Sequence, residues 1–127
     1  GVLVDVTLGG NADVLFIGNT IANNSNAGIN VPTSDASLIN LVIGGPDDVL
    51  DRNTITGNVG PGILFDLSNT ANGLTATIEN NLISGNQDGI QVNVADTASF
   101  GPGTTIFDNE ITDNIRDGIR LTRSDSG

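Results

Sequence analysis

The chain of 127 residues contains no cysteine, lysine, histidine, methionine, tryptophan or tyrosine. Without cysteine there are no disulfides, thiolate zinc sites or thiol nucleophiles, and without histidine and lysine there are no imidazole bases or Schiff bases. Four phenylalanines are the only aromatic residues. The side chains left for chemistry are carboxylates, hydroxyls, amides and arginine.

Basic charge is also scarce, since four arginines face fifteen acidic residues and the net charge is -11. An acidic surface repels nucleic-acid phosphates and anionic membranes, so we expect neither as a partner. No apolar run is long enough to span a bilayer, and we expect no membrane insertion.

The main pattern in the sequence is a repeat. Five glycines precede short alternating segments such as Gly62-Ile63-Leu64-Phe65, and they stand at positions 1, 28, 62, 89 and 118. By subtraction their spacings are 27, 34, 27 and 29 residues. A period near 28 predicts a solenoid, in which units too small to fold alone stack around one continuous core.

Two columns of asparagine keep the same phase as these glycines. They comprise Asn19, Asn53, Asn81 and Asn109, and then Asn24, Asn58, Asn86 and Asn114. Asparagine tolerates the left-handed backbone of a tight turn, and its amide both donates and accepts hydrogen bonds. We therefore predict that the eight side chains form structural ladders along the rod.

The pattern Asn-x-Ile-x-x-Asn followed by Gly-Ile-x-Val resembles the coil repeat of right-handed parallel β-helix proteins, the pectate-lyase-like group. The resemblance runs from Gly1 to about Arg123. It implies an all-β fold of about four coils of roughly 28 residues, with three short strands in each coil. The same coil occurs in polysaccharide lyases, hydrolases, epimerases, phage tailspikes and long surface proteins.

Alternation along the strands predicts four stacks of inward side chains. The stacks are Phe16, Leu50, Ile78 and Ile106; Ile21, Ile55, Ile83 and Ile111; Val2, Ile29, Ile63, Ile90 and Ile119; and Val4, Val31, Phe65, Val92 and Leu121. The longer interruptions are Thr33 to Asp48, Ser68 to Gly73 and Asp96 to Gly103. We expect them to bulge on one side of the rod and to form the walls of any binding groove.

One constellation combines charges of both signs. Asp88 and Asp117 precede glycines in adjacent units, with Arg116 and Arg120 nearby. Stacked carboxylates of this kind bind Ca²⁺ or share a proton, and together with arginine they bind carbohydrate. The alternative is a pair of Asp-Gly turns whose repulsion is relieved by arginine. We predict no catalytic residue and no cofactor, with Ca²⁺ as the ligand to test.

The pair Asp47-Asp48 is similar to the paired aspartates of β-helical polygalacturonases. Those enzymes also carry histidine and lysine motifs, and this chain has neither residue type.

Two functions follow as hypotheses. The first is a non-catalytic structural or adhesive segment of a rod or filament outside the cell or on its surface. Its partners would be flanking coils or other copies, stacked end to end over residues 1–127, because the chain opens and closes within copies of the same strand and shows no cap. The alternative is a β-helix that binds or processes polysaccharide.

Overall fold

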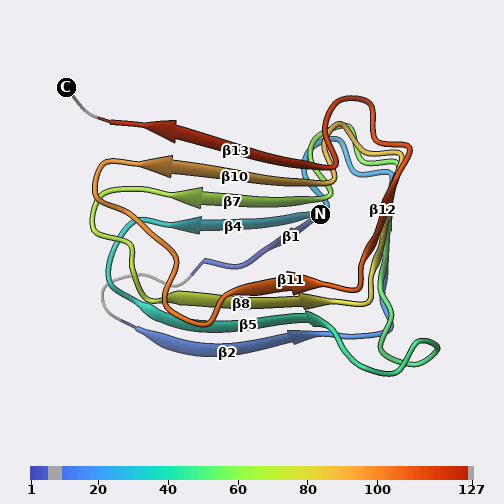
Figure 1. The fold of residues 1–127 in the computed structure, drawn as a ribbon, viewed down its shortest axis with the longest axis horizontal. Helices are drawn as coiled ribbons and strands as arrows, with labels where there is room; N and C mark the ends of the chain where they lie inside the picture. The colour runs from blue at the N-terminus through green and yellow to red at the C-terminus, as the bar shows by residue number, and fades with distance from the viewer. Residues whose placement is uncertain (6–9, 126–127) are drawn as a thin grey trace.

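The structure is a computed structural model that describes residues 1–5 and 10–125. This part of the chain contains thirteen β-strands and no helix, so it has no helix that could cross a membrane. Every strand pair is parallel. The strands form three sheets, which we call A, B and C (Figure 1).

The three sheets take one strand in turn from each pass of the chain. Sheet A contains β1 (Val2–Leu3), β4 (Ile29–Thr33), β7 (Ile63–Leu67), β10 (Ile90–Ala95) and β13 (Ile119–Ser124). Sheet B contains β2 (Asn11–Phe16), β5 (Leu38–Gly44), β8 (Leu74–Glu79) and β11 (Thr105–Phe107). Sheet C contains β3 (Thr20–Ala22), β6 (Thr54–Thr56), β9 (Leu82–Ser84) and β12 (Glu110–Thr112). Figure 1 shows sheets A and B facing each other and the short strands of sheet C joining them at one side.

Equivalent residues of successive coils pair directly. In sheet A, Ile29 pairs with Ile63, Ile63 with Ile90, and Ile90 with Ile119. In sheet C, Ile55 lies between Ile21 and Ile83. This in-register stacking confirms the predicted parallel β-helix.

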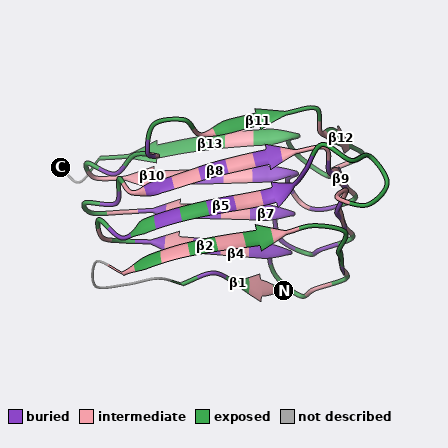
Figure 2. Cartoon of the chain, turned by 90° about the horizontal axis from the view of Figure 1, so that it is seen from below, coloured by how far each residue is buried: buried purple, intermediate pink, exposed green. Residues whose placement is uncertain are grey.

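The core is a set of apolar columns between the three sheets. Its central members Ile63, Ile83 and Phe65 are buried, and the ring of Phe65 meets that of Phe100 edge to face with centroids 5.3 Å apart. Phe100 comes from the loop between β10 and β11, so this loop helps to close the core at the corner between sheets A and B. Burial decreases towards the C-terminal end of the rod, where β11 and β13 are largely exposed (Figure 2).

One predicted core column is wrong at a single position. Leu50 is 70 % exposed, and Ile43 takes the place between Phe16 and Ile78. The reason is the unit of 34 residues, whose extra chain forms a projecting loop between β5 and β6. Leu50, three residues before Asn53, therefore lies in the loop instead of the strand.

The prediction that all three interruptions bulge on one side is wrong for the interruption that contains this loop. Ser68 to Gly73 and Asp96 to Gly103 connect sheet A to sheet B, as predicted. The interruption from Thr33 to Asp48 contains strand β5, and its turn after Gly44 lies at the corner between sheets B and C. The extra chain is thus placed at a different corner from the other two loops.

The sharp corners on either side of sheet C depend on left-handed residues just before the ladder asparagines. Asn80 and Asp108 precede Asn81 and Asn109 with φ of 55° and 53°. At the second corner Asn23, Gly57, Gly85 and Asp113 play this part, with φ between 55° and 66°. Glycine, asparagine and aspartate are the residues that accept this conformation at least cost.

Candidate functional site

The two asparagine ladders run the length of the rod at the corners of sheet C. In the first ladder, Asn53 donates through Nδ2 to Asn81 Oδ1 at 2.8 Å, and Asn81 donates to Asn109 Oδ1 through both its backbone N–H and Nδ2 at 2.9 Å. In the second, Asn58 and Asn86 repeat the same pattern, with an Nδ2 to Oδ1 distance of 2.8 Å. The predicted ladders are therefore present.

The ladder amides also hold the strands of the core. Asn81 Nδ2 donates to the carbonyl of Ile43 at 2.9 Å, and Asn86 Nδ2 donates to that of Ile55 at 3.0 Å. The interior members Asn53, Asn58, Asn81 and Asn86 are buried. Each amide thus satisfies buried backbone groups that a turn would otherwise leave unpaired.

The cluster at Asp88 also connects two coils. Asp88 is completely buried, its Oδ2 is ion-paired with the Arg116 guanidinium, and its Oδ1 accepts the backbone N–H of Asp117 at 3.1 Å. Both oxygens of Asp88 therefore face donors from the following coil.

The other two members of this predicted site lie apart from that contact. The Asp117 side chain is exposed, although its backbone meets Asp88. Arg120 lies on β13 opposite Gln91, on the outer face of sheet A. The structure thus brings Asp88, Arg116 and the Asp117 backbone together without a shared pair of carboxylates, and no group of three or more acidic side chains suited to a metal occurs in residues 1–5 and 10–125.

Asp47 and Asp48 lie in the projecting loop after β5. Asp47 Oδ1 accepts the backbone N–H groups of Val49 and Leu50, both at 2.9 Å, and these bonds hold the pKa of the Asp47 carboxyl below its usual range. Asp47 is therefore engaged in shaping its own turn.

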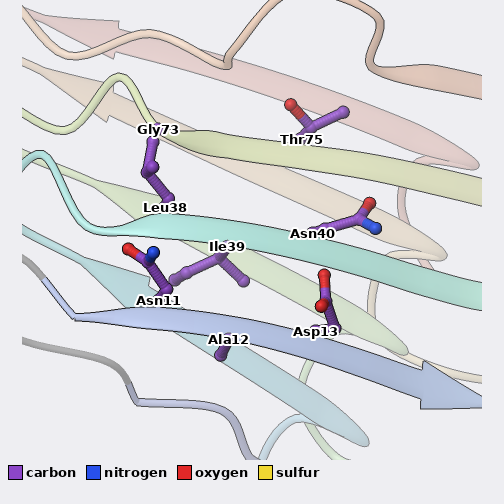
Figure 3. Close-up of a pocket in the computed structure, with 8 residues that line it drawn as sticks. All are labelled: Asn11, Ala12, Asp13, Leu38, Ile39, Asn40, Gly73 and Thr75. Atoms are coloured by element: carbon purple, nitrogen blue, oxygen red, sulfur yellow. The ribbon is translucent and has the colours of Figure 1, made fainter.

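A hollow of about 440 Å³ lies on the outer face of sheet B (Figure 3). Asp13, Asn40 and Thr75 come from β2, β5 and β8 and are paired in register, so their side chains form one polar row across three coils. Leu38 and Gly73 line the end next to the corner with sheet A. Thr75 Oγ1 reaches the carbonyl of Pro102 at 3.4 Å, which brings the loop between β10 and β11 to the edge of the hollow.

Sequence reasoning did not single out this row. Polar residues at alternate positions of a half-exposed strand are ordinary, so Asp13, Asn40 and Thr75 carry no distinctive signal. Of the three interruptions predicted to form groove walls, Thr33 to Asp48 contributes Leu38, Ile39 and Asn40 to the lining and Ser68 to Gly73 contributes Gly73. The loop of Asp96 to Gly103 reaches the edge of the hollow through Pro102.

The comparison with protein families agrees with this geometry. A family model described as a right-handed beta helix region matches residues 4–127. The chain belongs to the right-handed β-helix family. Searches of curated proteins and of solved structures gave no significant match to this β-helix.

Proposed function

We propose that this β-helix is a non-catalytic structural segment of a rod or filament located outside the cell or on its surface. The observation that carries the proposal is that the buried polar groups have their partners within the fold. The ladder amides and the Asp88 carboxylate all bind the neighbouring coil, so they stabilise the repeat. Support for the location comes from the use of the same coil in long surface proteins.

A specific observation supports polysaccharide binding as a second candidate function. The row of Asp13, Asn40 and Thr75 offers a carboxylate, an amide and a hydroxyl at the strand spacing of about 4.8 Å. Such groups hydrogen-bond the hydroxyls of a sugar chain, and Leu38 provides an apolar contact beside them. Among the residues that the structure describes, none of those lining the hollow is aromatic, so none of them offers an aromatic face on which a sugar ring could stack.

The two functions are separated by a binding and turnover assay on a glycan array and a panel of polysaccharides. The structural proposal predicts neither saturable binding nor product release by the unmodified chain. Saturable binding that the double variant D13A/N40A loses would overturn it in favour of the second function. The matched control is T20A/T54A, which removes two polar side chains from the outer face of sheet C, away from the hollow.

A further inference from the structure

The loop between β7 and β8 contains the one asparagine of the chain that is followed by glycine, Asn72 before Gly73. Asn72 is exposed, and its side-chain amide has no hydrogen-bond partner among the residues that the structure describes. The ladder asparagines differ on both points. Asn86, for example, is buried and donates through Nδ2 to the carbonyl of Ile55 at 3.0 Å. Asn72 therefore has a free amide in a segment outside the strands.

The backbone N–H of Gly73 is free as well. It has no acceptor in residues 1–5 and 10–125. Glycine has no side chain to shield its own nitrogen, so this atom can approach the side-chain carbon of the residue before it. A reactive nitrogen and an amide carbon thus stand next to each other, and neither is held by the fold.

The pair Asp88-Gly89 shows how the same fold protects such a sequence. Asp88 is completely buried, with one oxygen on Arg116 and the other on the backbone N–H of Asp117. The N–H of Gly89 donates to the carbonyl of Asp117 at 2.9 Å. Both reacting groups of that pair are therefore engaged, in contrast to those of Asn72 and Gly73.

We propose that Asn72 is a site of spontaneous deamidation in the folded protein, with water as the co-reactant. The nitrogen of Gly73 gives its proton to water and attacks Cγ of Asn72. A new C–N bond closes a five-membered succinimide ring, and the side-chain nitrogen leaves as ammonia. This inference goes beyond the proposed structural function and does not depend on it.

Water completes the reaction by opening the ring. Attack at the former side-chain carbonyl breaks the new C–N bond and gives aspartate at position 72. Attack at the other ring carbonyl breaks the original peptide bond to Gly73 and gives isoaspartate, in which the main chain runs through the former side chain. In both products a carboxylate replaces an amide, and nothing is oxidised or reduced.

The fold requires glycine at position 73. The carbonyl of Gly73 accepts the N–H of Ile39 at 3.0 Å. A Cβ added at Gly73 would overlap the carbonyl oxygen of Ser37 and would lie 2.9 Å from its carbon. No described contact requires asparagine at position 72. The packing of two coils therefore keeps the glycine of the reactive pair, whereas Asn72 can be replaced without loss of a contact.

The isoaspartate product should disturb the start of β8. It adds one C–C bond, about 1.5 Å, to the main chain directly before Gly73. The contact with Ser37 and the bond from Ile39 leave no room for this extra length, because a close-packed backbone transmits such a displacement. Gly73 and Leu38 also line one end of the hollow on sheet B (Figure 3). Deamidation should therefore loosen the corner between sheets A and B and alter that end of the hollow.

The test is a time course of the purified chain at mildly alkaline pH and physiological temperature. Trypsin cleaves after Arg52 and Arg116, and no arginine or lysine lies between them, so one peptide contains Asn69, Asn72 and Asn86. Fragmentation in a mass spectrometer assigns the gain of about 1 Da that replacement of an amide by a carboxyl group produces. The gain should appear at Asn72 and should be slower at mildly acidic pH, because the attacking nitrogen must lose its proton.

Two asparagines of the same peptide are internal controls. Asn69 is exposed in the same loop but is followed by Thr70, whose β-branched side chain crowds the N–H. Asn72 should therefore react at least about tenfold faster than Asn69. Asn86 should stay unchanged because its amide is buried and bonded. Equal rates at Asn72 and Asn69, or reaction at Asn72 in urea but not in the folded chain, would overturn the proposal.

Two variants isolate the chemistry and its consequence. Asn72→Gln keeps an amide but would need a six-membered ring, so it should show no mass gain at this position over the same period. Asn72→Asp carries the charge of the product on a normal main chain. The aged isoaspartate form, separated by anion exchange and identified with an isoaspartyl methyltransferase, should unfold at a lower temperature than Asn72→Asp and exchange the N–H of Ile39 faster. Identical behaviour of the two forms would overturn the predicted disturbance of β8.

Discussion

At the scale of the residue, each ladder asparagine and the residue before it have different roles in the turn. The preceding residue, such as Asn80 with φ of 55°, supplies the left-handed backbone. The ladder residue, such as Asn81, supplies an amide that joins coils and satisfies core carbonyls. The two tasks select for different properties, which explains why glycine, asparagine and aspartate all occur as left-handed residues at the first position and only asparagine occurs at the second.

We predict that Asn86→Ala destabilises the fold by roughly 2–4 kcal/mol, because several buried groups lose their partner and each unpaired group costs about 1–3 kcal/mol. The measurement is the free energy of unfolding from urea titration. Asn19→Ala is the matched control at the exposed start of a ladder and should cost less than about 1 kcal/mol. Equal losses for both variants would contradict the importance of burial.

Acidification should loosen the projecting loop before the rest of the fold. The pKa of Asp47 is lowered by the amides of Val49 and Leu50, so its contribution to the folded loop is complete above the ordinary aspartate pKa and is lost as the pH falls through the lowered value. Amide hydrogen exchange should show Val49 and Leu50 losing protection over this acidic range. Asp47→Asn should remove the pH dependence, and an unchanged profile in that variant would contradict the assignment.

The sequence predicted all eight ladder members because their spacing repeats in every unit. It could not locate the left-handed residues, since Gly18, Asn23 and Asp113 differ in type and only the corner geometry unites them. The candidate hollow could not be predicted either, because Asp13 and Asn40 become neighbours only through the pairing of β2 with β5.

At the scale of the element, the insertion after β5 shows where a coil tolerates extra chain. Gly44 pairs with Glu79, so Gly45 corresponds to Asn80 and Asn53 to Asn81. The residues between Gly45 and Asn53 are therefore the added ones, and at this corner the left-handed residue is Gly44, with φ of 89°. The repeat predicts Leu50 in the core because Asn53 shows where the insertion ends, whereas no repeated residue shows where it begins.

We predict that deletion of Pro46 to Arg52 leaves the stability of the fold within about 1 kcal/mol of the original, because loop length affects closure entropy only weakly. The ion pair of Arg52 with Glu110 is lost in this variant, but both side chains are partly exposed and such pairs contribute little. Circular dichroism and thermal unfolding provide the measurement. Loss of the cooperative transition would show that the loop supports the coil.

Core truncation should depend on the position along the rod. Ile83→Ala should cost about 2–5 kcal/mol, because the buried column has coils on both sides and cannot collapse into the cavity. Ile119→Ala in the exposed strand β13 should cost the monomer less than about 1 kcal/mol. Urea unfolding of dilute protein compares them, and similar values would contradict the described gradient of burial.

At the scale of the whole molecule, a net charge of -11 acts against compactness. The described residues form three ion pairs, so most acidic groups repel one another without a cationic partner. We predict that the unfolding temperature rises with added sodium chloride, because the screening length falls to about 10 Å at 0.1 M salt. A series with sucrose at matched osmolality is the control, and a falling temperature in salt would show that ion pairs outweigh the repulsion.

The insertion at one corner has a practical consequence for protein engineering. A foreign peptide placed between Gly45 and Asn53 would be displayed from a rigid support whose hydrogen-bond ladder continues beneath it. Equivalent grafts in adjacent coils would stand about 4.8 Å apart, which is the pitch set by parallel strand pairing. Epitopes or mineral-nucleating groups could therefore be displayed on this β-helix at a spacing known in advance.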